Sequence, residues 1–328
     1  MILTVTPNPS IDATLHLSED IELGGVNRAA SATSIAGGKG VNVARVAHLA
    51  GHAVAALFPS SVSDQFLHLV AATGLPFDNL PVAGSIRVNT TLTEPGGRTT
   101  KINGPGPELS ADQVTELLTR LVDRAAHADA VVLAGSLPPG VPETFYVDAT
   151  AALQARFPDL IIAVDTSDNP LRALGKGFAT AAPTIIKPNG FELGQLAGLD
   201  GASLETAAEN GDFGPVLAAA ARVVASGVRE VLVTLGGAGA LLVTAAGAWR
   251  ATPPPVTVRS TVGAGDSSLA GYLLARIAGK EPPEALRSAV AYGTAAAGLP
   301  GTDLPSPAQL NIDGVSVSPL PLSPVKDI

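Results

Sequence analysis

The 328-residue sequence contains no cysteine. This excludes disulfide bonds, thiol catalysis and zinc sites built on thiolates. Aromatic residues are scarce as well, at 4% of the sequence, so alanine, valine, leucine and isoleucine must build the core. Charged residues make up only 15% and hydrophobic residues 46%, a balance typical of a compact folded protein.

Long apolar runs are also missing, since no stretch approaches the ~18 uninterrupted apolar residues of a membrane-spanning helix. The first residues, MILTVTPNPS, lack a basic segment followed by a long apolar run, so no signal peptide is predicted. The formal net charge of −9 argues against broad binding to nucleic acid or anionic membranes. We expect a cytoplasmic protein that binds neither nucleic acid nor membranes. Any anionic ligand should be bound by a few specific Lys and Arg residues.

Short β-branched runs alternate with longer Ala- and Leu-rich segments along most of the chain. The predicted strands are 2–6, 130–135, 160–165, 184–189 and 230–236, and the predicted helices are 39–51, 110–127, 142–157 and 214–227. Alternation at this spacing predicts right-handed βαβ units, and therefore a parallel sheet covered by helices on both faces. Ser110, with Gln113 three residues later, predicts a capping box.

Two polar, Thr-rich stretches, 11–37 and 85–106, break this rhythm. The second contains EPGG between two alternating arms, which is a hairpin signal. We predict that both stretches form antiparallel strands projecting from the main sheet, and ordinary surface hairpins are the alternative. The last residues are rich in Pro and Ser, so we expect a folded unit over 1–308 and a loose tail over 309–328.

The motif RSTVGAGDSSLAG (259–271) places Asp266 directly after the turn formed by Gly263, Ala264 and Gly265, where a helix begins. Glycines bring the backbone close to a ligand, and a helix N-terminus suits an anion such as phosphate. A carboxylate beside an anion site is energetically unfavourable, so Asp266 should have a specific function there. The simplest alternative to a role at the anion site is that Asp266 caps the helix.

Two motifs near the start could bind a sugar phosphate. AGGKGVNVA (36–44) is a glycine turn opening a helix, in which Lys39 could meet a phosphate and Asn42 could bond hydroxyls. TPNPSID (6–12) places Asp12 after the first strand, where its carboxylate could accept hydrogen bonds from sugar hydroxyls. On local grounds, a plain strand-to-helix turn and a turn-forming aspartate remain equally good interpretations.

Two later motifs also follow predicted strands, where open parallel sheets bind ligands. In IIKPNGFELGQL (185–196), Lys187, Asn189 and Glu192 could serve phosphates and metal-bound waters, or Glu192 could simply lie in a first helical turn. VTLGGAGALL (233–242) could receive a nucleotide or form a hairpin turn. No convincing Ser/His/Asp set accompanies these motifs.

In this order, GGKGVNVA, KPNGFE and TVGAGDSSLAG resemble the ribokinase-like (PfkB) carbohydrate kinases over roughly residues 1–308. TPNPSID, GGKGVNVARV, TTKINGPGPEL and GSLPPGVP are most similar to the family's 1-phosphofructokinase and tagatose-6-phosphate kinase branch. The resemblance implies a three-layer α/β/α fold with a mostly parallel central sheet and a small antiparallel β lid built from about 11–37 and 85–106. It also implies ATP and Mg²⁺ as cofactors and a homodimer formed through the lid.

The resemblance further implies a role for each motif residue. Asp266 becomes the general base, and Gly263, Ala264 and Gly265 supply backbone N–H groups to the transferred phosphoryl. The residues expected at the sugar hydroxyls are Asp12, Gly37, Gly38 and Asn42. Those expected at the phosphate already on the substrate are Lys39, Arg87 and Lys101, with Ser136 and Asn103 nearby and Arg28 either in that pocket or reaching a partner subunit. Those expected at the nucleotide are Lys187, Asn189, Glu192 (with Mg²⁺, through water), Thr234, Gly236, Gly237 and Gly239.

The implied reaction is ATP-dependent phosphorylation of a ketohexose phosphate, first of all fructose 1-phosphate at its 6-hydroxyl. A tagatose-6-phosphate kinase, a 6-phosphofructokinase and a non-catalytic sugar-phosphate sensor are the alternatives. A dinucleotide-binding dehydrogenase is disfavoured because no G-x-G-x-x-G follows the first strand. Arg259 and Ser260 stand where many family members carry an acid, which leaves a K⁺ site open.

Overall fold

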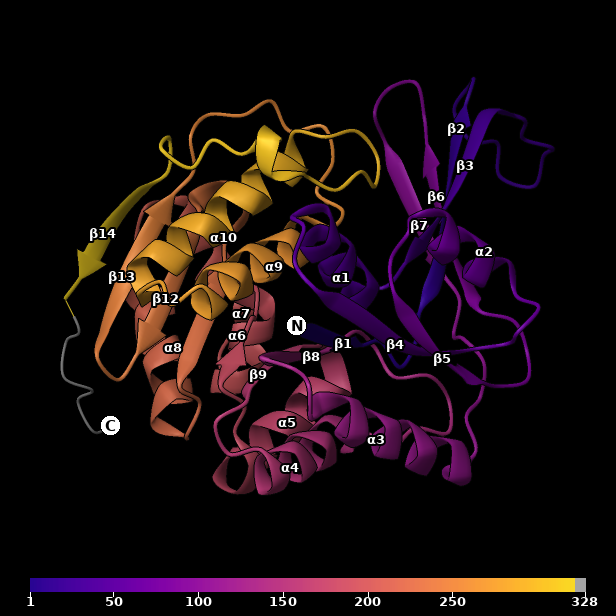
Figure 1. Ribbon diagram of the computed structural model, residues 1–328. Helices are drawn as coiled ribbons and strands as arrows, with labels where there is room; N and C mark the ends of the chain where they lie inside the picture. The colour runs from indigo at the N-terminus through magenta and orange to yellow at the C-terminus, as the bar shows by residue number, and fades with distance from the viewer. Residues whose placement is uncertain (322–328) are drawn as a thin grey trace.

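The computed structural model describes residues 1–321, in which ten strands form a central sheet flanked by helices (Figure 1). The spatial order is β14-β13-β12-β11-β10-β9-β8-β1-β4-β5. The strands are β1 Ile2–Val5, β4 Val54–Ser60, β5 Phe77–Pro81, β8 Ala130–Ala134, β9 Ile161–Asp165, β10 Ile185–Ile186, β11 Glu230–Thr234, β12 Ala240–Thr244, β13 Gly247–Thr252 and β14 Ser316–Leu320. Neighbours from β5 to β11 pair in parallel, whereas β11 to β14 pair antiparallel.

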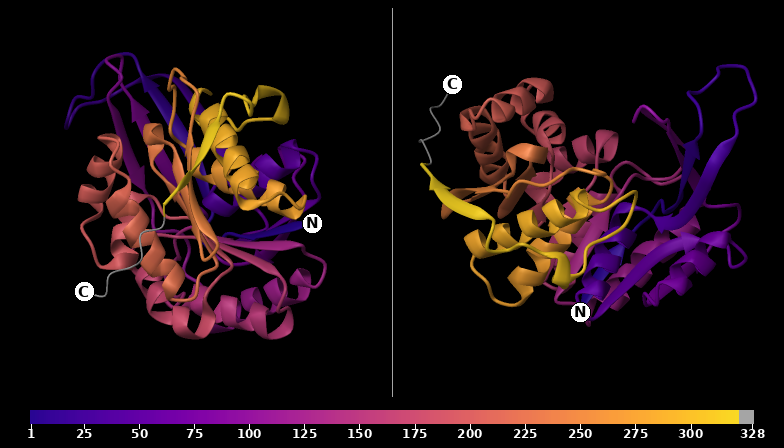
Figure 2. Two further views of the ribbon diagram at one scale, coloured as in Figure 1. Left: turned by 90° about the vertical axis from the view of Figure 1, so that its left-hand side faces the viewer. Right: turned by 90° about the horizontal axis from the view of Figure 1, so that it is seen from above.

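Helices cover both faces of this sheet, as the two further views in Figure 2 show. One face packs against α1 Lys39–Leu49, α2 Gln65–Ala72, α9 Ala264–Ile277 and α10 Pro282–Ala297. The other packs against α3 Ala111–Ala125, α4 Phe145–Arg156, α5 Asp168–Ala181, α6 Gly190–Ala197, α7 Gly201–Glu209 and α8 Gly214–Ala225. The central strand β1 contributes side chains to both helix layers, because Ile2 points into the first and Leu3 and Val5 into the second.

The predicted three-layer α/β/α architecture is therefore confirmed, and its core is aliphatic as the composition requires. Each strand and helix predicted from the sequence is present, with β10 shortened to two residues. The capping box at the start of α3 is also present, since the Ser110 hydroxyl accepts from the Gln113 N–H and the Gln113 side chain accepts from the Ser110 N–H. No helix within residues 1–321 is long and apolar enough to cross a membrane.

A four-stranded lid sheet projects from one end of the body, at the upper right of Figure 1. Its strands, in spatial order, are β3 Ala29–Gly37, β2 Ser10–Leu17, β6 Arg87–Thr93 and β7 Thr99–Asn103. The outer pairs are antiparallel as predicted, but the central pair, β2 with β6, is parallel. The difference arises because both strands start at the body, where Ser10 lies beside Arg87, and run outward together.

The C-terminal segment differs from the expected loose tail within the described residues. Ser316–Leu320 form β14, which pairs with β13 along its whole length, and the neighbouring Val315 is buried. The pairing covers the free edge of β13, which gives the Pro- and Ser-rich sequence an ordered place in the sheet. Residues 322–328 of the predicted tail lie outside the described residues.

Candidate active site

The predicted motifs lie at the carboxyl ends of the parallel strands, beside the base of the lid. At the centre is the turn that opens α9. Gly263 occupies the N-cap position with a φ of 76°, a left-handed conformation that favours glycine. Asp266 lies in the first turn of the helix but makes no side-chain capping bond. Instead its Oδ2 accepts a hydrogen bond of 2.8 Å from Nδ2 of Asn42, so the capping interpretation is wrong.

The glycine turn lies against a lysine. A methyl group added at Gly265 would come within 3.2 Å of Lys187 Nζ, so the missing side chain leaves the ammonium next to the turn's backbone. Both the helix N-terminus and this ammonium favour negative charge in the space beside Asp266. The sequence predicted that Lys187 and the turn serve phosphate, and the structure brings them together.

Asp165 is the residue of this centre that sequence reasoning missed. It ends β9 with a fully buried side chain, and its carboxylate lies 2.7 Å from Lys39 Nζ and 3.0 Å from Lys187 Nζ. The only available signal was an acid at the carboxyl end of the apolar run 160–165, a pattern that also fits many ordinary strand ends. Asp165 thus supplies the counter-charge for two lysines that come from distant parts of the chain.

The buried charges shift one another's pKa values. Burial, and then the charge of Asp165, raise the pKa of Asp266 to about 6, against the opposing effect of Lys39. Burial disfavours the ammonium of Lys39, but the neighbouring carboxylates, Asp165 first among them, raise its pKa above its ordinary value. Asp266 is therefore ionised at neutral pH and still a better proton acceptor than an exposed aspartate, as general-base catalysis requires.

Lys39 faces two carboxylates in the structure. It was expected at the substrate's phosphate, but its ammonium bonds Asp165 and lies 3.7 Å from Glu192 Oε1. Glu192 in turn forms a capping box with Asn189, each side chain accepting from the other's backbone N–H. The predicted alternative for Glu192, a place in the first helical turn, is thus observed, and its other oxygen, Oε1, faces Lys39.

Asp12 lies where the lid meets the body. Its Oδ1 accepts hydrogen bonds of 2.8 Å from the Ser10 hydroxyl and 3.0 Å from Asn89 Nδ2. Gly37 packs so closely on this carboxylate that a side chain there would overlap it, and Gly38 caps α1 with a φ of 111°. The glycines therefore let the turn that precedes α1 pass directly beside Asp12. Asn89 was not predicted from the sequence.

Arg87 carries a positive charge that no carboxylate within 4 Å balances in the described part of the chain. Its Nη2 donates to the Asn8 carbonyl at 3.0 Å, and Asn8 Nδ2 donates to the Ser136 hydroxyl at 3.2 Å. Burial lowers the pKa of Arg87, and Asp12 opposes that shift. A half-buried guanidinium without a counter-charge favours an anionic ligand beside it.

Three further predicted residues lie on the lid. Lys101 and Asn103 are exposed on β7, and the register places Asn103 opposite Asn89, which bonds Asp12. Strand alternation puts Lys101 on that same face. Arg28 lies instead at the exposed tip of the lid, beside Glu22 and neighbouring acids in the loop between β2 and β3. The structure therefore does not bring Arg28 into the pocket around Asp12.

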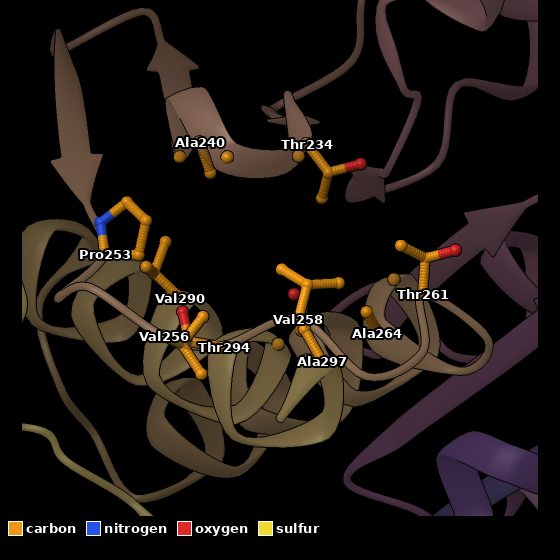
Figure 3. Close-up of a pocket in the computed structure, with 16 residues that line it drawn as sticks. Thr234, Ala240, Pro253, Val256, Val258, Thr261, Ala264, Val290, Thr294 and Ala297 are labelled. Atoms are coloured by element: carbon orange, nitrogen blue, oxygen red, sulfur yellow. The ribbon is translucent and has the colours of Figure 1, made fainter. Parts of the chain in front are cut away.

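An apolar cavity of about 270 Å³ opens beside the glycine turn (Figure 3). Thr234 and Ala240 lie on one side, and Val258, Ala264 and Ala297 lie on the other. The predicted nucleotide residues Gly236, Gly237 and Gly239 also line it, in the short turn that joins β11 to β12. The turn therefore joins two antiparallel strands, as the hairpin interpretation predicts, and also forms a wall of the cavity. The cavity's size and apolar lining fit a nucleobase.

Comparison with known proteins assigns this arrangement to a family. The model of the pfkB family carbohydrate kinases matches residues 6–309. The chain belongs to this family. It is 36% identical over 307 residues to a 1-phosphofructokinase of Haloferax volcanii, covering 93% of each protein. It is 37% identical over 330 residues to a 1-phosphofructokinase of Rhodobacter capsulatus, covering 99% of each.

The structure agrees with this assignment to the pfkB family. It is similar to the crystal structure of phosphofructokinase-2 from Escherichia coli in complex with substrates and products, with a TM-score of 0.83 and 30% identity. The match covers 94% of this chain and 96% of that one. The protein is therefore a sugar kinase, a phosphotransferase of carbohydrate metabolism.

Proposed function

We propose that this pfkB family kinase transfers the γ-phosphoryl group of ATP to the 6-hydroxyl of fructose 1-phosphate, giving fructose 1,6-bisphosphate. The observation that carries the proposal is the position of Asp266, held by Asn42 at the glycine turn, with its pKa raised to about 6. The uncompensated Arg87 supports a substrate that already carries a phosphate. The names of the relatives at 36% and 37% identity support fructose 1-phosphate.

Asp266 acts as the general base in this proposal. The 6-hydroxyl loses its proton to the Asp266 carboxylate as its oxygen bonds the γ-phosphorus. The bond from that phosphorus to the β–γ bridging oxygen breaks, ADP leaves, and the proton passes from Asp266 to solvent. The N–H groups of Gly263, Ala264 and Gly265 and the ammonium of Lys187 stabilise the charge on the transferred group.

The base of the lid provides the sugar-phosphate site. Asp12 and Asn42 bind hydroxyls, with Gly37 and Gly38 letting the sugar approach the backbone. Arg87 and Lys101 bind the phosphate at C1, with Asn103 and Ser136 beside it. The lid then closes over the sugar and excludes water, which limits hydrolysis of ATP.

The nucleotide occupies the cavity of Figure 3 and extends toward Lys187. Glu192, kept in place by Asn189, would hold Mg²⁺ through water with its Oε1, which lies 3.7 Å from Lys39 Nζ. When bound, the ion would neutralise charge on the phosphates. No group of three or more His, Cys, Asp or Glu side chains in the described residues is arranged to hold a metal ion.

We further propose that residues 1–308 form the kinase unit, with β14 extending its sheet, and that the protein works in the cytoplasm as a homodimer. Leu23 and Val26 support the dimer, because they are 89% and 79% exposed at the lid tip. Apolar side chains grouped at the end of a projecting sheet favour contact with a second copy.

The test of the function is ADP release with Mg·ATP and a panel of sugars: fructose 1-phosphate, fructose 6-phosphate, tagatose 6-phosphate and fructose. The same rates measured in KCl and in NaCl would show whether the activity depends on K⁺. We expect kcat/KM to be highest for fructose 1-phosphate. A preference for tagatose 6-phosphate or fructose 6-phosphate would keep the mechanism and overturn the substrate. No sugar-dependent rate would overturn the proposed reaction.

Arg87→Ala tests the phosphate site within the same assay. Loss of a half-buried cation that pairs with phosphate raises KM for fructose 1-phosphate by about 10²-fold, while KM for unphosphorylated fructose changes little. Equal losses for both sugars would show that Arg87 supports the fold and not the phosphate.

A further inference from the structure

A second buried charge cluster lies at the opposite end of the sheet from the candidate active site. Glu230, the first residue of β11, is only 7% exposed. Its Oε2 accepts a hydrogen bond of 2.7 Å from the Tyr272 hydroxyl, and its Oε1 accepts one of 2.7 Å from Arg276 Nη2. We refer to Glu230, Tyr272 and Arg276 as the Glu230 cluster. Both donors come from α9, the helix that begins with the glycine turn.

The same two elements form opposite walls of the nucleotide cavity. Thr234, the last residue of β11, lines the cavity together with Gly265 and Ser268 of α9. The strand and the helix run in opposite directions, so they meet twice, once at the cavity and once at the Glu230 cluster. From Glu230 to Thr234 the strand spans about 13 Å, and from Gly265 to Arg276 the helix spans about 16 Å.

Between these two meeting points, the buried side chains of the two elements are apolar. Leu232 of β11 belongs to the same buried cluster as Leu269 and Leu273 of α9. Close packing on α10 and α1 holds α9 within its helix layer. Two charge-assisted hydrogen bonds to one carboxylate are directional, and they fix both the rotation and the axial position of α9.

We propose that the Glu230 cluster is a positioning device that sets α9 against β11, and thereby sets the width of the nucleotide cavity and the placement of Asp266. Its effect on nucleotide binding follows from the geometry alone, and its effect on turnover rests on the proposed function. Glu230, Tyr272 and Arg276 are positioning residues, because they act through α9 and lie at the far end of the helix from the cavity.

A positioning role and a purely stabilising role predict effects of different size on nucleotide binding and rate. A buried ion pair is often no more stabilising than apolar side chains of similar volume. Misplacement of reacting groups by about 1 Å, in contrast, can cost about 10²-fold in rate. Weakening the cluster should therefore change nucleotide affinity and catalysis by more than the loss of stability explains.

Tyr272→Phe is the direct test, because it removes one hydroxyl and keeps the ring. The matched control is Tyr292→Phe on α10: this tyrosine is also buried, and its ring packs against Gly271 of α9. For each variant, we would measure ADP affinity by calorimetry, kcat and both KM values by ADP release, the pH–rate profile, and the melting temperature.

We expect Tyr272→Phe to weaken ADP binding and raise KM for ATP by about tenfold, to shift the acid limb of the pH–rate profile, and to leave KM for fructose 1-phosphate unchanged. Tyr292→Phe should change none of these. Wild-type ADP affinity and pH profile in Tyr272→Phe, or equal effects in both variants, would overturn the proposal.

A second variant and a sugar-free titration complete the test of the Glu230 cluster. If Tyr272→Phe fails to fold, Arg276→Lys probes the same contact at a side chain that is 26% exposed. It should weaken ADP binding in the same direction, and unchanged binding would overturn the proposal. The ADP titration needs no sugar, so wild-type protein that binds ADP but does not phosphorylate fructose 1-phosphate would contradict the proposed function and leave the cluster's role testable.

Discussion

Two buried carboxylates with different environments stand at the centre of the site. Asp165 lies between two lysines, and burial, its largest cause of shift, is outweighed by Lys187 and Lys39, so its pKa falls below its ordinary value. Among residues 1–321, the side chain of Asp266 has only the amide of Asn42 as a hydrogen-bond partner, and its pKa is raised. A pair whose pKa values are pushed apart in this way separates a permanent counter-ion from a proton acceptor.

The first prediction follows from the raised pKa of Asp266. Because the base must be deprotonated, kcat/KM for fructose 1-phosphate should fall as the pH drops through about 6. Asp165→Asn removes the negative neighbour that helps to raise that pKa, so the acid limb should move to lower pH by about one unit. The measurement is a pH–rate profile of both proteins. An acid limb that stays in place or moves upward would contradict the electrostatic coupling.

The second prediction concerns the close approach of Gly37 to Asp12. A side chain at Gly37 would overlap the Asp12 carboxylate, so Gly37→Ala should displace it and raise KM for fructose 1-phosphate by about tenfold or more. KM for ATP should change little. Gly96→Ala is the matched control, since a methyl group there meets nothing within 4 Å. Similar kinetics in the two variants would show that Asp12 does not bind the sugar.

Most residues of the candidate site were predictable because they stand in short motifs with glycines and strand ends around them. Asp165 was not, since its partner Lys39 is 126 positions away in the sequence and its partner Lys187 follows a different strand. The contact of Lys39 with Asp165 was missed for the same reason: the sequence shows a lysine in a glycine turn, but not which carboxylate lies beside it. Such pairings depend on tertiary packing.

At the scale of elements, the predictions that rest on local patterns are confirmed. The apolar runs became strands and the Ala- and Leu-rich segments became helices, because hydrophobic periodicity is a property of each segment. Strand pairing is not local, which is why the parallel pair of β2 with β6 and the edge position of β14 were not predicted. The two positions expected for Arg28, in the pocket or toward a partner subunit, could likewise not be separated from the sequence, and the structure places its loop at the lid tip.

The third prediction tests the lid as a dimer contact. Replacing Leu23 and Val26 together by Asp should halve the mass measured by light scattering, because two charges at the lid tip would have to be buried. Val62→Asp is the control, since Val62 is 72% exposed in a loop of the body and should leave the dimer intact. An unchanged mass in the lid variant, or a monomeric wild-type protein, would contradict the proposed dimer.

At the scale of the whole molecule, the buried charge of Asp266 is a cost to stability. Its folded pKa of about 6 lies above the ordinary 3.8, so its contribution to stability is full below pH 3.8 and is lost as the pH rises through 6. The ionised carboxylate therefore costs up to about 3 kcal/mol at neutral pH. The buried carboxylate therefore lowers the free energy of unfolding while it provides a reactive group in the site.

The fourth prediction is that Asp266→Asn is more stable than the wild type at pH 7.5, by about 1–3 kcal/mol in urea unfolding. The gain should shrink by pH 4.5, where the wild-type carboxyl is mostly protonated. A variant that is less stable than the wild type at pH 7.5 would show that the pKa of Asp266 is not raised.

The central claim is that Asp266 is the general base of a sugar-phosphate kinase, and one comparison tests it most directly. ADP release with Mg·ATP and fructose 1-phosphate would be measured for the wild type and Asp266→Asn, with ADP affinity determined for both. We predict that kcat falls by about 10²–10⁴-fold while ADP binding is unchanged. An Asp266→Asn protein that retains more than about a tenth of the wild-type kcat would contradict the claim, because a positioned base contributes at least ~10²-fold.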